Sequence, residues 1–388
     1  MAAGDVVRRA GRAVSSRVPV ALAHDYVTQR GGAERVAAIM AEAFTGAPLY
    51  TTLYDPEGTF ADFEGLDIRT SVLNRLPWLR RHHRLALPLL APAVSTMRVD
   101  ADVLLASSSG WAHGIRCTGR TVVYCHAPAR WLYQKDVYLG ADEGPPSQRA
   151  QRFLAAATLG MVGPALRRWD AGKAKTADRY LVNSTVIRTA VAEVYGIEAE
   201  VLAPPPAMTP GGPMRRPDGV TEPFMLCVAR LLPYKNVDVV IRALDRLDGL
   251  GLVVVGRGPD EQRLRALAAH NPSLRILGGA SEAELRWLYA NAVGLVAASY
   301  EDFGLTPLEA AGFGKPTAAL RAGGYLDTID PVVNGVFFEN PDPASVADGV
   351  AALVERTWDA AAIGGHADRF GRARFIERLR GVVAEFGA

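Results

Sequence analysis

Residues 294–310 read GLVAASYEDFGLTPLEA, and this short stretch contains the unit from which the fold is predicted. Its first five residues are small and apolar, which is typical of a buried strand. A polar loop follows. Thr306 and Pro307 are then typical of the N-cap and the first position of a helix. A strand, a loop and a helix thus follow one another, as they do in α/β proteins.

Short apolar runs of the same kind recur along the chain, with helical stretches between them. Strands that alternate with helices pair in parallel, so we predict parallel sheets covered by helices. The other runs occupy residues 18–23, 103–106, 121–125 and 180–182 in the first half, and 224–228, 252–255 and 274–277 in the second. In such sheets ligands bind at the carboxyl ends of the strands.

A proline-rich segment, residues 203–223, separates the two groups of strands and has no apolar periodicity. This composition is typical of a linker. We therefore predict an α/β protein with two Rossmann-like domains that face a central cleft, the first spanning residues 17–205 and the second 222–368. Apolar residues at helical spacing predict a C-terminal helix, 369–388, that packs back toward the first domain.

The 388 residues are 49% apolar and 22% charged, with a formal net charge of +2. Such a chain is expected to fold into more than one domain, and its weak charge argues against a nucleic-acid partner. Its three cysteines form no C-x-x-C spacing, which argues against a disulfide framework and against a zinc site. A reducing, cytoplasmic environment is therefore expected.

Neither a signal peptide nor a membrane-spanning segment is expected from the sequence. The first sixteen residues lack the apolar core of a signal peptide, and no run reaches about 18 apolar residues.

Residues Arg69 to Arg98 carry six arginines, two histidines and no acidic residue among interleaved leucines. Such a segment can lie on an anionic membrane surface, and an ordinary solvated basic face over core leucines fits it equally well.

Polar residues and glycines follow the predicted strands of the first half. Gly31 and Gly32 precede a predicted helix, where they either leave amides free for an anion or simply make a tight turn. His126 follows the run 121–125 at once, at a strand end that faces the cleft, although most isolated histidines are ordinary surface or core residues. Asp100-Ala101-Asp102 has the D-x-D pattern of some metal sites, but it precedes its strand, at the wrong end for a ligand. We predict no metal site there.

Cations and glycines follow the strands of the second half. Arg230 and Lys235 come after the run 224–228, where two positive charges can neutralise a diphosphate, although both residue types are also common on surfaces. Gly256 follows the run 252–255. A side chain there would obstruct a nucleotide, and a plain strand-to-helix turn would also account for this glycine.

The opening stretch carries the most informative residues. Glu301 and Glu309 are separated by seven residues across the predicted loop-to-helix junction. Glu309 alone could belong to a capping box with Thr306, but this leaves Glu301 unexplained. The backbone amides near Gly304, Leu305 and Thr306 would form an anion site at the start of the helix.

Taken together, these motifs resemble glycosyltransferase family 4, which has the GT-B fold, and within it the bacterial mannosyltransferases of polysaccharide assembly. The resemblance covers nearly the whole chain and is carried by five segments: residues 24–26, 31–35, 124–130, 228–238 and 301–310. It implies a nucleotide-sugar donor, with GDP-mannose favoured and a UDP-sugar as the alternative. It also implies a glycan or lipid-linked acceptor, and neither cofactor nor metal.

The resemblance also implies a role for each candidate residue. Arg230 and Lys235 would bind the donor diphosphate, Glu301 would contact hydroxyls of the transferred sugar, and Glu309 would hold the ribose. His126 would sit beside the sugar, and Gly31 and Gly32 would let the first domain close on the phosphates. The reaction would retain the anomeric configuration, with the departing phosphate accepting the proton of the acceptor hydroxyl.

The sequence departs from the family pattern in three places. Residues 203–207 lack the aspartate that often follows this proline turn, and Asp327 stands where a glutamate is usual. Residues 131–136 differ from the aromatic-rich stretch of similar mannosyltransferases, which leaves the acceptor open. A nucleotide-sugar epimerase and a non-catalytic nucleotide-sugar or glycan-binding subunit are the alternative functions. A dinucleotide oxidoreductase is disfavoured because the full glycine fingerprint is absent.

Overall fold

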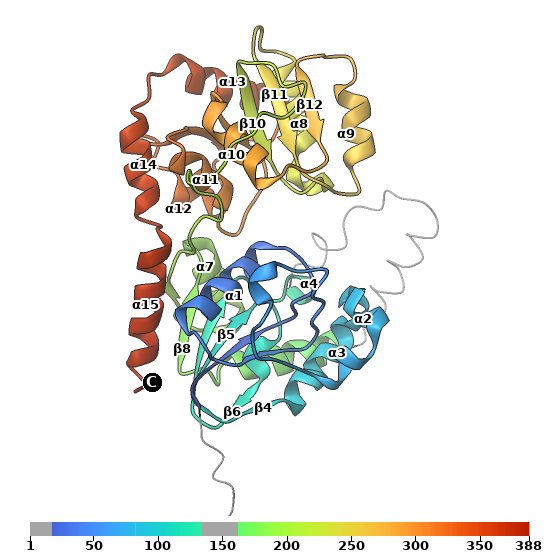
Figure 1. Cartoon of the computed structure of the whole chain (residues 1–388), viewed down its shortest axis with the longest axis vertical. Coiled ribbons are helices and arrows are strands. Elements are labelled where there is room, and N and C mark those ends of the chain that lie inside the picture. The colour runs from blue at the N-terminus through green and yellow to red at the C-terminus, as the bar shows by residue number, and fades with distance from the viewer. Residues whose placement is uncertain (1–17, 82, 134–161, 388) are drawn as a thin grey trace, which may run out of the picture.

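A computed structural model describes residues 18–81, 83–133 and 162–387, in which the chain forms two main parallel sheets, each covered by helices (Figure 1). We call the seven-stranded sheet with its helices the first lobe, and the six-stranded sheet with its helices the second lobe. The first sixteen residues and residues 134–136, on which expectations were stated above, lie outside the described part of the chain.

The first sheet has the strand order β3-β2-β1-β5-β7-β8-β9, and all neighbours are parallel. These strands are β1 (Val18–His24), β2 (Leu49–Thr51), β3 (Ile68–Thr70), β5 (Ala101–Ser108), β7 (Arg120–Cys125), β8 (Arg179–Val182) and β9 (Glu200–Val201), while β4 (Arg98–Val99) and β6 (Arg116–Cys117) pair separately. His24, the last residue of β1, pairs in register with Ser107 of β5. This register brings polar side chains together at the carboxyl edge.

The second sheet has the order β12-β11-β10-β13-β14-β15, again parallel throughout. Its strands are β10 (Phe224–Val228), β11 (Gly251–Val255), β12 (Leu274–Leu277), β13 (Gly294–Ala297), β14 (Thr317–Leu320) and β15 (Gly335–Phe338). The direction of winding reverses between β10 and β13, and in the first sheet between β1 and β5. Loops diverge at such points and leave room for a ligand.

Helices connect the strands and cover both sheets (Figure 1). In the first lobe they are α1 (Gly32–Ala43), η1 (Ala61–Phe63), η2 (Val72–Arg75), α2 (Pro77–Arg81), α3 (His83–Thr96), η3 (Ala112–Gly114), α4 (Arg130–Tyr133), residues 162–174 and α7 (Thr185–Tyr195). In the second lobe they are η4 (Pro233–Lys235), α8 (Val237–Leu244), α9 (Glu261–Ala268), α10 (Glu282–Asn291), α11 (Leu305–Gly312), α12 (Tyr325–Thr328), α13 (Pro343–Glu355) and α14 (Ala360–Asp368).

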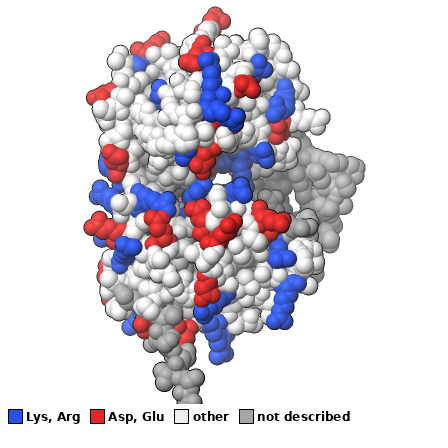
Figure 2. Space-filling view, viewed as in Figure 1, with Lys and Arg blue, Asp and Glu red and all other residues white. Residues whose placement is uncertain are grey.

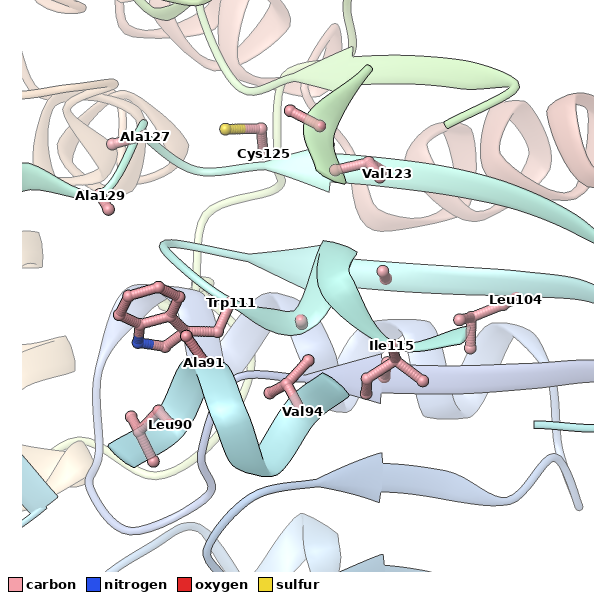
Figure 3. Packing of buried hydrophobic residues seen from close by; sticks show 14 of the residues in the cluster. Leu90, Ala91, Val94, Leu104, Trp111, Ile115, Val123, Cys125, Ala127 and Ala129 are labelled. Atoms are coloured by element: carbon pink, nitrogen blue, oxygen red, sulfur yellow. The ribbon is translucent and has the colours of Figure 1, made fainter. Parts of the chain in front are cut away.

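Each sheet buries both of its faces, because alternate residues of a strand point to opposite sides. In β1, Ala21 and Ala23 belong to one core and Val20 and Leu22 to another. Figure 3 shows the first of these cores, in which Leu90 and Val94 of α3 lie beside Trp111 and Ile115. Trp111 is 1% exposed, which makes it one of the largest fully buried side chains.

The last helix, α15 (Arg372–Ala384), packs on the first lobe although it follows the second in sequence (Figure 1). Phe375, Leu379, Val382 and Val383 are buried in the same core as α1. Each such side chain contributes about 1.5–3 kcal/mol when it is buried. The expected return of the C-terminal helix to the first domain is therefore confirmed.

The predicted α/β class and all eight apolar runs are confirmed as strands, with ends that shift by two residues at most. The prediction missed seven strands. Five of them have only two or three residues each, namely β2, β3, β4, β6 and β9. The other two are β14 and β15, of four residues each. Strands of two or three residues show too little alternation to be recognised. The domain limits at residues 205 and 222 stay a prediction.

Candidate donor site

The loops after β10 and β13 form the centre of the candidate site, because the winding of the second sheet reverses between these strands. The loop after β10 contributes Arg230 and Lys235, and the loop after β13 contributes Glu301. The structure therefore brings together Lys235 and Glu301, which the sequence had placed in two separate motifs.

Lys235 and Glu301 form an ion pair across the reversal point. Lys235 is the last residue of η4, and the next residue, Asn236, takes a left-handed conformation with φ 54°. Asn236 donates a hydrogen bond to the carbonyl oxygen of Ala298 (2.8 Å), and Ser299 donates one to Glu301 (2.6 Å). These bonds hold the two loops and their charges in fixed positions.

Arg230 is exposed at the surface, two residues after the end of β10. Within the described residues it makes no ion pair, which leaves its guanidinium group available for an anion. Lys235 is only 10% exposed, in contrast, and its charge is balanced by Glu301. The two cations therefore differ in how readily they can reach a diphosphate.

Helix α11 begins two residues earlier than expected. Its N-cap is Gly304 and its first residue is Leu305, so the expectation of Thr306 as N-cap and Pro307 as first residue is wrong. The reason is the left-handed conformation of Gly304, with φ +85°, in a place where a Cβ would lie 2.5 Å from the Tyr325 ring. No side chain caps this helix, so its first amides remain free to bind an anion.

Gly256 follows β11, and the structure explains the need for a glycine at this position without a ligand. A Cβ at this position would collide with the carbonyl oxygen of Ala229, in the neighbouring loop. Gly256 thus allows the ends of β10 and β11 to approach each other closely. Its expected part in nucleotide binding stays a prediction.

Glu309 is the fifth residue of α11 and is buried, with 8% of its surface exposed. It accepts a hydrogen bond from the Tyr289 hydroxyl (2.6 Å) and takes no part in a capping box. Burial raises the pKa of Glu309, although Tyr289 and the backbone of Ala207 and Met208 partly offset this. Glu309 therefore ties α11 to the linker, and its contact with a ribose stays a prediction.

The first lobe presents Gly31 and Gly32 to the second lobe. Gly31 is the N-cap of α1, and no side chain caps that helix. A Cβ on Gly32 would lie 3.6 Å from Leu305 at the start of α11. The N-termini of two helices therefore face each other across the lobes, which concentrates positive helix-dipole potential there.

His126 lies immediately after β7 and is 8% exposed. Its Nε2 is 2.8 Å from the Ser107 hydroxyl. Burial, together with the nearby charge of His24, lowers the pKa of His126 to about 3. The ring is therefore neutral near pH 7, and it can exchange hydrogen bonds with a sugar without carrying charge.

Several polar contacts cross between the lobes next to these residues. Arg130 forms an ion pair with Asp302, and the Ser184 hydroxyl donates to the carbonyl oxygen of Asp302 (2.5 Å). Asp327 accepts hydrogen bonds from the amide (2.6 Å) and hydroxyl (2.5 Å) of Thr185. Figure 2 shows charged side chains of both signs gathered in the band between the lobes.

Sequence reasoning missed part of this arrangement. Gly323 and Gly324 pack under the backbone of Glu301 and Phe303, where a Cβ would collide with it. Two adjacent glycines after an apolar run were a usable signal. His24 and Ser107 were not recognised as neighbours of His126, since no local pattern joins residues so far apart in sequence.

The described residues contain no group of three or more His, Cys, Asp or Glu side chains that could hold a metal ion. Asp100 and Asp102 flank the first residue of β5, at the amino edge of the sheet and thus opposite to the candidate site. In the same part of the chain, no helix is long and apolar enough to cross a membrane.

Comparison with known proteins identifies the second lobe. The family model for glycosyl transferases group 1 matches residues 215–370. Glycogen synthase of Thermus thermophilus is 35% identical over 145 residues, which cover 36% of this chain and 33% of that protein. A GDP-mannose-dependent alpha-(1-6)-phosphatidylinositol monomannoside mannosyltransferase of Mycobacterium tuberculosis is 32% identical over 152 residues, covering 34% of this chain and 38% of that protein.

A D-inositol 3-phosphate glycosyltransferase of Acidothermus cellulolyticus is 28% identical over 252 residues and covers 56% of this chain. The chain thus matches from about a third to just over half of the length of these relatives. Anabaena HepE, solved with UDP and glucose, superposes over 95% of this chain and 100% of its own, with a TM-score of 0.65 and 16% identity. This chain therefore carries a glycosyl transferases group 1 domain within the GT-B fold.

Proposed function

We propose that this protein transfers a hexose from a nucleotide-sugar to a glycan or lipid-linked acceptor, with retention of configuration and without a metal ion. The observation that carries the proposal is the Lys235–Glu301 ion pair beside the uncapped start of α11. Cations and free amides suit a diphosphate, and a carboxylate suits the hydroxyls of a sugar. The two kinds of group stand side by side at the reversal point of the sheet.

In the proposed reaction the bond between the sugar carbon and the diphosphate oxygen breaks, and negative charge develops on the leaving diphosphate. Arg230, Lys235 and the amides of Leu305 and Thr306 would stabilise that charge. The departing phosphate oxygen takes the proton of the acceptor hydroxyl, whose oxygen then bonds to the sugar carbon on the same face. The protein contributes electrostatics and alignment, and no protein nucleophile is needed.

The favoured donor is GDP-mannose. Its support is the likeness to a relative whose name specifies GDP-mannose, together with the motif resemblance to mannosyltransferases. The solved structure that contains UDP is 16% identical, a level at which the likeness extends to the fold alone. A UDP-sugar is therefore the alternative that the experiment has to distinguish.

The acceptor is proposed to be glycan or lipid-linked and to be reached at the cytoplasmic face of the membrane. Four large apolar side chains of the segment Arg69 to Arg98 are exposed, namely Val72 (65%), Leu76 (44%), Trp78 (52%) and Leu89 (48%). They accompany the arginines of that segment. Side chains 81–88 lie outside the described part of the chain. Apolar groups among basic ones suit an anionic lipid surface.

Calorimetry with GDP and UDP, in the presence of a chelator, tests the donor site. We expect one nucleotide to bind to the wild type and to lose affinity in Lys235→Ala. Arg242→Ala is the matched control. Arg242 is an exposed cation in the last turn of α8, and this helix leads back to the edge of the sheet opposite to the candidate site. Binding of neither nucleotide, or equal losses in both variants, would refute the assignment.

A further inference from the structure

Four buried polar side chains form a row beneath the carboxyl edge of the first sheet. Glu34 comes from α1, His24 from the end of β1, Ser107 from β5, and His126 from the residue after β7. Their exposed fractions lie between 1% and 8%. Nε2 of His24 is 3.9 Å from Glu34 Oε1, and Nδ1 of His24 is 2.9 Å from Ser107 Oγ. The row ends where Ser107 Oγ meets His126 Nε2, at 2.8 Å.

The surroundings of Ser107 fix the direction of these hydrogen bonds. Nδ1 of His24 also lies 3.2 Å from the Ser107 carbonyl oxygen, which can only accept. Nδ1 of His24 therefore carries a hydrogen and donates to the oxygens of Ser107. The hydroxyl hydrogen of Ser107 is left to donate to its other neighbour, Nε2 of His126. A neutral ring that accepts at Nε2 carries its proton on Nδ1.

We propose that Ser107, oriented by His24, is a positioning residue that fixes His126 as the Nδ1–H tautomer, so that His126 donates a hydrogen bond to an oxygen of the bound sugar. This inference rests on the proposed function. Nδ1 of His126 makes no hydrogen bond within the described residues. It is absent from the set of fully buried polar atoms without a partner, so part of its surface is exposed. It therefore remains accessible to a ligand.

The charged and titratable groups around the row favour the same arrangement. Burial opposes a charge on His24, but the carboxylates of Glu34 and Asp25 outweigh it and raise the pKa of His24. Burial and the charge of His24 together lower the pKa of His126. Tyr124, whose ring centroid lies 5.2 Å from that of His126, stays neutral because burial raises its pKa. Protons are thus retained on His24 and not added to His126.

Nuclear magnetic resonance of isotope-labelled histidine tests the tautomer directly, without donor or acceptor. The chain has seven histidines, and the His126 signals are assigned by their absence in His126→Gln. In the wild type we expect a protonated Nδ1 and a bare Nε2. In Ser107→Ala we expect the ring to shift toward the Nε2–H form.

Kinetics of the same variant test the contact with the sugar. The loss of one oriented hydrogen bond predicts a roughly tenfold fall in kcat, with little change in nucleoside diphosphate affinity. Ser107→Thr, which keeps the hydroxyl, is expected to restore the tautomer. Ser108→Ala is the matched control for the spectrum, because Ser108 bonds to Asp25 (3.4 Å) and His113 (3.0 Å) instead of His126.

The outcomes separate this inference from the proposed function. A wild-type His126 protonated at Nε2, or a ring that is unchanged in Ser107→Ala, would overturn the role of Ser107 while leaving transferase activity intact. An altered tautomer with unchanged kcat would overturn the contact with the sugar. Absence of nucleotide binding to the wild type would instead refute the proposed function, and the contact with the sugar along with it.

Discussion

Arg130 of the first lobe and Asp302 of the second lobe form an ion pair, although 172 positions separate them in the sequence. Arg130 begins α4, four residues after His126, and Asp302 follows Glu301 directly. Burial raises the pKa of Asp302, and the charge of Arg130 opposes this shift. The pair therefore joins the two loops that carry the candidate catalytic residues.

Removal of this pair is expected to loosen the contact between the lobes. In Arg130→Ala the half-buried Asp302 carboxylate loses its counter-charge, and an unpaired charge there favours hydration. We expect a larger radius of gyration in small-angle scattering than for the wild type. Arg120→Ala is the control, since Arg120 pairs with Asp178 inside the first lobe. Equal scattering curves for both variants and the wild type would contradict this prediction.

Asp327 is expected to stabilise the start of α7 from the opposite lobe. Its carboxylate accepts from both the amide and the hydroxyl of Thr185, the first residue of that helix. Loss of a carboxylate that satisfies helix amides costs about 1 kcal/mol. Asp327→Ala should therefore lower the free energy of unfolding in urea by about this amount. A midpoint equal to that of the wild type would show that the contact contributes nothing.

Gly304 is expected to be intolerant of any side chain. Its φ of +85° is unfavourable for other residues, and a Cβ would meet the Tyr325 ring at 2.5 Å. Gly304→Ala should destabilise the protein by roughly 1–3 kcal/mol. Gly365→Ala is the matched control in an exposed part of α14, where a Cβ meets nothing within 4 Å. There we expect a gain of roughly 0.5–1 kcal/mol. A thermal unfolding series that ranks the two variants in the opposite order would contradict the argument.

Glu309 is expected to make stability depend on pH. The pKa of Glu309 is raised in the folded protein above its ordinary value of 4.5. Above pH 4.5 the folded state therefore binds more protons than the unfolded state. The contribution of Glu309 is therefore fully present below pH 4.5 and is lost as pH rises through its folded pKa. Glu309→Gln should remove this part of the pH dependence in denaturant unfolding.

A companion variant tests the cause of that shift. The Tyr289 hydroxyl lowers the pKa of Glu309 against the larger effect of burial. Tyr289→Phe should therefore raise this pKa further and extend the loss of stability to higher pH. If Glu309→Gln and the wild type show parallel pH profiles, the shift assigned to Glu309 is wrong.

The exposed apolar residues of α2 and its neighbours are expected to support binding to anionic vesicles. Trp78→Ala removes the largest of them, 52% exposed in the wild type, and should reduce the fraction that sediments with anionic vesicles. Val332→Ala removes another exposed apolar side chain, 76% exposed, in the second lobe and serves as control. No sedimentation of the wild type would refute the membrane contact and leave the donor site untouched.

The sequence alone predicted the fold class and the edge of each sheet at which polar residues gather. Both depend on local patterns. A short apolar run becomes a buried strand, and the residue after it must lie at the carboxyl edge. Arg230, Lys235, Glu301 and His126 could be selected in this way, because each of them lies within seven residues of a strand end.

Tertiary structure decided which of these residues meet and how the loops are shaped. The helix start at Gly304 depends on Tyr325 and on the glycines beneath the loop, so a capping rule applied to Thr306 alone placed it wrongly. The row from His24 through Ser107 to His126 and the Arg130–Asp302 pair arise from strand register and lobe packing. Such contacts join residues far apart in the chain, and their geometry follows from the packed fold, which no local pattern contains.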